Sequence, residues 1–312
     1  MKPLIIIFCI GILSCTNDSQ SINKELIKLE VAAKSNAPVF KFGGLKSLAL
    51  MPDDGRSDIK LNLESKKESN EPLVVHVFVP LCDNDHQGIV PTTESLGNGF
   101  SLRSNLYWAT SNGMKKYFQK KPWDQIADVG FKANDTVLER VAFRRQFDDC
   151  EVILICDAYR GDMMAPCLED YFSSLAGLST DVLRYGKVEL DLTKDVDMVV
   201  FNGHNGLMDV AIDPILKNAE ERFFKRKDAV VIACASQSYF NPRFIETDSY
   251  PLLTTNSLLY PGAFILDGII EQWANNSTEE EIKNAAGDAY HEVKDCGKQA
   301  ARNMFSTGWL SN

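Results

Sequence analysis

Four apolar runs of strand length divide the central part of the chain, and polar residues follow each of them. The runs cover 73–79, 151–156, 196–201 and 229–233 and are rich in Val and Ile. Near-continuous apolar runs of this length are typical of strands that are covered on both faces, as in a parallel sheet. A shorter run at 252–255 predicts a fifth strand.

Helical patterns lie between and after these strands. Apolar residues at helical spacing predict helices over 105–119, 165–178, 214–225 and 264–274. Ser277 and Glu280 match a capping box and predict the start of a last helix. Alternation of strands and helices predicts an α/β fold, namely a doubly wound, mostly parallel sheet flanked by helices, over residues 73–312.

The first residues have the pattern of a bacterial export signal. Lys2 precedes an apolar run at 4–13, which is shorter than the roughly 20 residues that a membrane-spanning helix needs. The run ends Ile-Leu-Ser-Cys at 12–15, which resembles the lipobox of bacterial lipoproteins. The resemblance implies a signal peptide at 1–14 and a lipid on Cys15, which would anchor the protein to a membrane of the cell envelope, facing the periplasm or the cell surface. A plain signal peptide with an incidental cysteine is the alternative.

The region between the signal and the first strong strand is less regular. Residues 15–38 are polar and predict a tether, and residues 39–72 predict a small N-terminal segment and linker. Within it, 59–63 has a weak strand pattern and 66–71 is charged. Lys66-Lys67 would be a processing point if residues 16–72 were a prosegment.

The charge balance argues against one class of partner. The chain has 33 Lys+Arg against 43 Asp+Glu, a formal net charge of −10, and its longest unbroken basic run is only 225–227. Nucleic-acid binding needs clustered basic residues, so we expect no nucleic-acid partner. The six cysteines beyond residue 15 do not have the spacing of a disulfide framework, and their pairing stays open.

Chemically useful side chains follow the predicted strands, at the edge where sheets of this class bind ligands. Asp83 and Asp85 follow the first strand, Asp157 the second, His204 the third and Cys234 the fourth. A thiolate is a strong nucleophile, and a neighbouring imidazole can lower its pKa or act as its general base. The pattern therefore predicts a His204–Cys234 dyad.

Two glycines flank the histidine. Gly203 and Gly206 would let the backbone turn and a substrate approach closely. Backbone N–H groups near Gly206 and Cys234 are candidates for an oxyanion hole.

The two motifs together resemble the caspase-like cysteine peptidases, which include caspases, metacaspases, gingipains, clostripain and legumain. The resemblance rests on an apolar strand leading to His204 with Gly206, then a helix and an apolar strand that ends Ala233-Cys234. It implies a caspase-like fold, Cys234 as nucleophile, His204 as its partner, a peptide or protein substrate and no cofactor. Asn205 stands where the family usually has a glycine, which puts the oxyanion-hole geometry in question.

The same resemblance suggests a specificity. Metacaspase-like relatives use an acidic residue after the first strand to hold Arg or Lys before the cut. Asp83 and Asp85 occupy that place, which implies cleavage after Arg or Lys. Asp157 would join the wall of the same substrate pocket.

Other interpretations stay open. Strings such as 82–91 and 203–209 resemble a family of uncharacterised bacterial lipoproteins, which brings no activity with it. The protein would then be a catalytically inactive caspase-like lipoprotein that binds a peptide or glycan. A metal-dependent hydrolase would use ligands such as Cys82, Asp83, Asp85, His86 and His204, but the chain has only four histidines and no His-x-x-x-His, so we expect no metal. Asp209 either orients His204 or begins a loop or helix, and the second is favoured.

Overall fold

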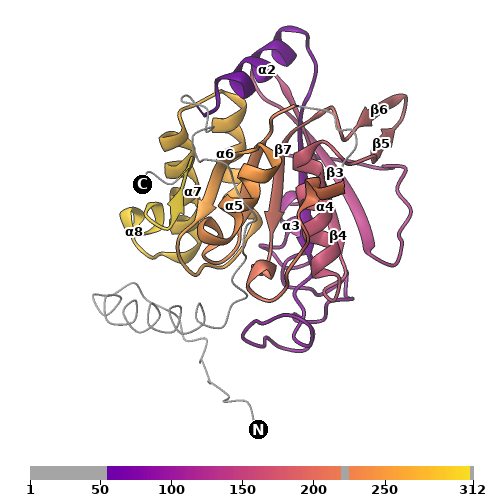
Figure 1. The fold of residues 1–312 in the computed structure, drawn as a ribbon, viewed down its shortest axis with the longest axis vertical. Helices are drawn as coiled ribbons and strands as arrows, with labels where there is room; N and C mark the ends of the chain where they lie inside the picture. Colours follow the sequence, from indigo (N-terminus) through magenta and orange to yellow (C-terminus); the bar gives the residue numbers. More distant parts are fainter. Residues whose placement is uncertain (1–54, 219–224, 310–312) are drawn as a thin grey trace.

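The structure is a computed structural model that describes residues 55–218 and 225–309 (Figure 1). The expected signal peptide, the tether at 15–38 and residues 39–54 lie outside the described residues. Within the described part, no helix is long and apolar enough to cross a membrane.

One large sheet forms the centre of the molecule (Figure 1). Its strands follow the order β10-β9-β8-β7-β1-β4-β3-β2. The parallel strands are β1 (Leu73–Pro80), β4 (Glu151–Tyr159), β7 (Val196–Asn202), β8 (Asp228–Ile232) and β9 (Tyr250–Thr255). The antiparallel strands are β3 (Val137–Gln146), β2 (Asp124–Ile126) and β10 (Phe305–Ser306). The prediction of a doubly wound, mostly parallel α/β sheet is confirmed.

Helices cover both faces of the sheet because its central strands are apolar on both sides. In β1, Val75 and Val77 pack into the core on one face, and Val74 and Phe78 pack into the core on the other. The first core includes residues of α3 (Met114–Phe118), α6 (Ala263–Ala274), α7 (Glu279–Lys294) and α8 (Lys298–Arg302). The second includes residues of α4 (Met164–Ala176) and α5 (Ser236–Thr247).

The segment before β1 is a helix, not the predicted strand and linker. In α2 (Ser57–Glu68), Ile59 and Leu63 lie one turn apart and are buried against the sheet. Lys66 and Lys67, expected at an exposed processing point, are buried, and Lys66 Nζ lies 2.6 Å from Asp197 Oδ2. Residues 55–72 are therefore an integral part of the α/β domain.

One predicted helix is shorter in the structure, and another is described only in part. Of the helix expected at 105–119, only α3 forms, because Asn105 holds the chain in a loop. The Asn105 side chain accepts from Cys82 N and Tyr107 N and donates to Cys82 O. Of the helix expected at 214–225, the structure describes a 3-10 turn, η3 (Ile215–Asn218), and 219–224 lie outside the described residues.

The last helix starts one residue later than predicted. Thr278 and Glu281 form the capping box, with Glu281 Oε2 accepting from Thr278 N at 2.8 Å, in place of Ser277 and Glu280. A break at Asp295, with φ of 48°, separates α7 from α8. The hairpin of β5 (Val182–Tyr185) and β6 (Val188–Asp191) was not predicted.

Candidate active site

His204 and Cys234 follow neighbouring parallel strands at the same level. In the pairing of β7 with β8, Asn202 lies opposite Ile232, and Gly203 N donates to Ile232 O at 3.2 Å. Two residues beyond this pair, the register sets His204 opposite Cys234. Asn205 Nδ2 donates to Cys234 O at 2.7 Å and joins the two strand ends.

The imidazole of His204 is held by a carboxylate. His204 Nε2 lies 2.5 Å from Asp209 Oδ2, and the same oxygen accepts from Gly88 N at 2.9 Å. Burial acts to raise the pKa of Asp209, but the hydrogen bonds from His204 and Gly88 hold that pKa below its usual value. The structure thus favours the orienting role for Asp209 that the sequence pattern had ranked second.

The thiol of Cys234 contacts a carbonyl and not the imidazole. Cys234 Sγ donates to Leu259 O at 3.5 Å, and no hydrogen bond joins Cys234 Sγ to His204 within the described residues. Burial raises the pKa of the Cys234 thiol, and backbone hydrogen bonds of Leu259 and of Cys234 itself only partly oppose the rise. The thiol is therefore protonated at neutral pH in this arrangement.

The two glycines beside the histidine serve close packing. Gly203 N–H is already engaged with Ile232 O, so it is not free to bind an oxyanion. Gly206 begins the 3-10 turn η2 (Gly206–Met208), and a Cβ there would lie 2.3 Å from Met164 Sδ. Gly206 therefore allows the turn after His204 to approach α4.

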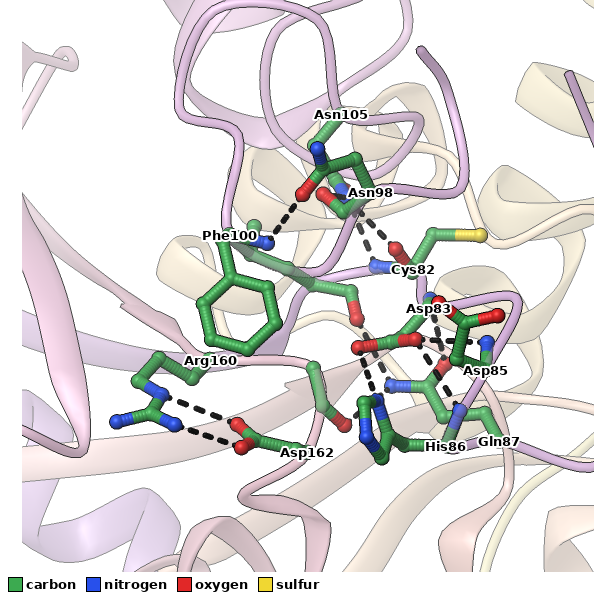
Figure 2. A network of polar contacts seen from close by, with 12 residues as sticks. Cys82, Asp83, Asp85, His86, Gln87, Asn98, Phe100, Asn105, Arg160 and Asp162 are labelled. Atoms are coloured by element: carbon green, nitrogen blue, oxygen red, sulfur yellow. Dashed lines mark hydrogen bonds and ion pairs between the residues drawn. The ribbon is translucent and has the colours of Figure 1, made fainter. Parts of the chain in front are cut away.

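Asp83 organises the loop that follows β1 (Figure 2). Its Oδ1 accepts from Asp85 N at 2.8 Å and from His86 N at 3.1 Å, and its Oδ2 lies 3.0 Å from His86 Nδ1. The hydrogen bond to Asp83 raises the pKa of His86. Asp83 is 2% exposed because Gly99 and Gly161 pack against it, and a Cβ on either would lie within 3 Å of Asp83 Oδ2.

An acidic pocket of about 430 Å³ lies beside this loop. Its lining consists of Asp83, Asn84, Asp85, Thr92, Glu94, Gly97, Asn98, Gly99 and Phe100. Asp85 and Glu94 are exposed, and in the described part of the chain neither takes part in an ion pair. The ring of Phe100 lies 5.0 Å from the guanidinium of Arg160 (Figure 2). Neither His204 nor Cys234 lines this pocket, but the loop that borders it is connected to His204 through Gly88 N and Asp209 Oδ2.

Asp157 lies inside the sheet and not in the pocket wall. Strand β4 continues to Tyr159, and Asp157 is only 1% exposed. Its Oδ1 accepts from Arg140 Nε at 2.6 Å, and its Oδ2 accepts from Arg140 Nη2 at 2.7 Å and lies 2.8 Å from His76 Nε2. Burial opposes ionisation, but Arg140 and His76 hold the pKa of Asp157 far below its usual value. Both carboxylate oxygens of Asp157 are thus engaged in a buried ion pair.

The other candidate ligands do not gather around one point. Across 55–218 and 225–309, no group of three or more His, Cys, Asp or Glu side chains is arranged to hold a metal ion. Cys82 Sγ points away from Asp83 (Figure 2), and burial raises the pKa of Cys82 to about 11. No disulfide joins the described cysteines, which are Cys82, Cys150, Cys156, Cys167, Cys234 and Cys296.

Sequence patterns missed several residues that shape the dyad. Gly88 and Leu259 act through backbone atoms, which leave no signal in the sequence. Three exposed apolar residues are close in the sequence to Gly88, Asp209 and Leu259: Val90, Met208 and Leu258 are 50%, 38% and 53% exposed.

No family model, no curated protein and no solved structure matches this chain. The function is therefore inferred from the residues of the chain and their geometry. The resemblances to caspase-like peptidases and to bacterial lipoproteins stay predictions.

Proposed function

We propose that the protein is a cysteine endopeptidase with Cys234 as nucleophile and His204 as general base. The observation that carries this proposal is the register of β7 and β8, which sets the two residues at adjacent strand ends on the edge where α/β sheets bind ligands. Met208 and Leu258, exposed neighbours in sequence of Asp209 and Leu259, would offer apolar contacts to an extended peptide substrate.

In the proposed reaction, Cys234 Sγ attacks a peptide carbonyl while His204 takes the thiol proton. The C–N bond then breaks, the leaving amine receives that proton from His204, and the acyl group stays on sulfur as a thioester. Water next attacks the thioester, with His204 taking the water proton and returning it to sulfur. The carboxylic acid leaves and the free thiol is regenerated.

The resting state needs one rearrangement before attack. The Cys234 thiol is protonated and donates to Leu259 O, so it must leave that carbonyl to reach a substrate. Proton removal by His204 at the time of attack suits this arrangement better than a preformed thiolate–imidazolium pair.

The acidic pocket supports a preference for Arg or Lys side chains. Asp85 and Glu94 form no ion pair within the described residues, and the ring of Phe100, with the Arg160 guanidinium 5.0 Å from it, is still half-exposed and can contact the stem of a long basic side chain. Asp83 is buried beneath them and acts by shaping the loop.

Turnover of fluorogenic peptides by the full chain tests the activity. Peptides with Arg or Lys before the cut would be compared with matched peptides that carry Asp or Leu. Cys234→Ala and His204→Ala should each reduce hydrolysis at least about 100-fold, while Cys150→Ala, at a buried thiol distant in the chain, should not. Hydrolysis that persists in folded Cys234→Ala, or its absence with every peptide, would reject the peptidase.

The specificity has a separate test. Asp85→Asn combined with Glu94→Gln should raise KM for Arg and Lys peptides and leave kcat nearly unchanged, because these carboxylates bind substrate without taking part in the chemistry. Cleavage only after Asp or Leu would reject the basic preference and leave the dyad standing.

A second function is favoured by one observation. The protonated Cys234 thiol, without a hydrogen bond to His204, fits a catalytically inactive protein that binds a peptide or glycan at the same edge. Saturable binding of peptides without hydrolysis, equal in wild type and Cys234→Ala, would establish this function in place of the peptidase.

We also propose a lipid anchor on Cys15 that holds the protein to a membrane of the bacterial cell envelope. The lipobox pattern at 12–15 supports it, and residues 1–54 lie outside the described structure. Intact mass of protein from a bacterial membrane should show the loss of residues 1–14 and an added diacylglycerol. Recovery of Cys15→Ala in the membrane fraction would contradict the anchor.

A further inference from the structure

We infer that Asp209 is the positioning residue of His204, and that the N–H of Gly88 holds Asp209 in place for this task. The inference rests on the proposed function for its catalytic meaning, but it concerns the protonation and orientation of one imidazole and can be measured without turnover.

The first step of the argument is the chemistry of the contact. An ionised carboxylate can only accept hydrogen bonds, so at 2.5 Å from Asp209 Oδ2 the Nε2 of His204 must carry the proton. In a neutral imidazole, the other nitrogen then has a free lone pair. The contact thus selects the tautomer in which Nδ1 is the base, and among the described residues no side chain or backbone group bonds to Nδ1.

The second step is what keeps the carboxylate ionised. Asp209 is part-exposed, at 29% of its side chain, but Oδ2 receives Gly88 N–H at 2.9 Å as well as the imidazole. Both donors stabilise the charged form, in line with the lowered pKa of Asp209. A carboxylate with two fixed donors also has little freedom to rotate away from His204.

The third step is what places the Gly88 N–H beside Asp209. Gly88 belongs to the loop that Asp83 and Gln87 fasten to the strand ends, since Gln87 Nε2 donates to Leu81 O at 2.8 Å and to Gly161 O at 3.1 Å. A Cβ at Gly88 would lie 2.4 Å from Asp209 Oδ1, so only glycine allows this approach. The loop that borders the acidic pocket therefore also determines the position of the His204 partner.

The direct test is nitrogen NMR of the full chain labelled with ¹⁵N-histidine, with His204→Ala to assign the signals. Wild type should show His204 as the Nε2–H tautomer, with a far-downfield proton on Nε2. Asp209→Ala should lose that proton signal and give a mixture of tautomers. Gly88→Ala, which leaves both side chains of the pair unchanged, should weaken the same signal because its methyl group displaces the carboxylate.

Asp213→Asn is the matched control, since Asp213 is an exposed acidic residue four positions away from Asp209. It should leave the His204 signal unchanged. An Nδ1–H tautomer in wild type, or a tautomer that is the same in Asp209→Ala, would overturn the inference.

The kinetic consequence separates this inference from the proposed function. If the peptidase proposal holds, Asp209→Ala should reduce kcat about 100-fold with little change in KM, and Asp209→Asn, which keeps an acceptor oxygen, should recover part of the loss. Turnover that needs His204 but ignores Asp209 would reject the positioning role alone. Absence of turnover together with an Asp209-dependent tautomer would reject the peptidase alone.

Discussion

The two ends of the central strands carry the same kinds of charged residues, but these residues have different partners at each end. At the amino edge, Asp228 is fully buried and accepts from Arg56 Nε at 2.8 Å, from Arg56 Nη2 at 2.7 Å and from Trp273 Nε1 at 2.8 Å. Asp197, also fully buried, binds both Lys66 and Lys225. These carboxylates form buried or part-buried ion pairs with arginine and lysine side chains.

At the carboxyl edge, Asp157 and Asp162 are paired with Arg140 and Arg160, but two other carboxylates face weak bases. Asp83 and Asp209 contact His86 and His204, and the imidazole of His86 is half-exposed. A histidine can gain or lose its proton near neutral pH, which an arginine cannot. The comparison teaches that Asp197 and Asp228 at the amino edge are fixed in ion pairs with lysine and arginine, whereas Asp83 and Asp209 at the carboxyl edge are paired with histidines.

The largest effect is expected at the amino edge. Asp228→Ala would leave the Arg56 guanidinium buried without its carboxylate, so we expect the free energy of unfolding to fall by about 3–5 kcal/mol. Urea titration followed by tryptophan fluorescence measures it. An Asp228→Ala variant as stable as wild type would contradict a stabilising role for the charge pairs at the amino edge.

Lys227 is the exception to the pairing of charged residues at the amino edge. It is fully buried, and Nζ donates to Ser174 O at 2.5 Å without an ion pair in the described part of the chain. Burial, with Lys225 nearby, lowers the pKa of Lys227 to about 7. Because that pKa lies below the unfolded value of about 10.4, the group destabilises the fold most at and below pH 7, and the penalty shrinks as the pH rises toward 10.

Lys227→Met should therefore raise the free energy of unfolding at pH 6 by about 1–4 kcal/mol. The gain should vanish near pH 10. Lys225→Met is the control. It should lower the free energy of unfolding, since it removes a partner of Asp197. A Lys227→Met gain that is the same at both pH values would show that Lys227 is not titrating in this range.

A smaller loss of stability is expected at the carboxyl edge. Asp209→Ala should lower the free energy of unfolding by no more than about 1 kcal/mol, because its contacts are part-exposed. The same variant should strongly change the His204 signal. A loss as large as that of Asp228→Ala would erase the difference between the two edges.

The smallest effect concerns the pair of buried Asp83 and half-exposed His86 in the loop after β1. The hydrogen bond to Asp83 raises the pKa of His86, so an NMR titration should find His86 above its ordinary value. Asp83→Asn keeps an oxygen for the two backbone donors and removes the charge, which should return the pKa of His86 toward that value. A His86 titration that is unchanged in Asp83→Asn would show that the pair does not persist in solution.

Sequence patterns were reliable where burial is local and uniform. The apolar runs of β1, β4, β7 and β8 identified the central strands because each is covered on both faces. Strand β3 was missed because Arg140, Arg144 and Arg145 interrupt its apolar pattern. Helix α2 was mistaken for a linker because Lys66, which the pattern treats as solvated, is held by the buried carboxylate of Asp197 in another segment.

By itself, the sequence determined that His204 and Cys234 follow buried parallel strands, because the alternation of apolar runs and polar ends is a property of consecutive residues. Only the tertiary structure decided their partners. The donor that holds Asp209 comes from Gly88, 121 positions earlier, and Asp157 is buried by Arg140 of a neighbouring strand. Charge pairing and burial depend on which segments meet in space, and they decide which of several equally placed polar residues remain free for chemistry.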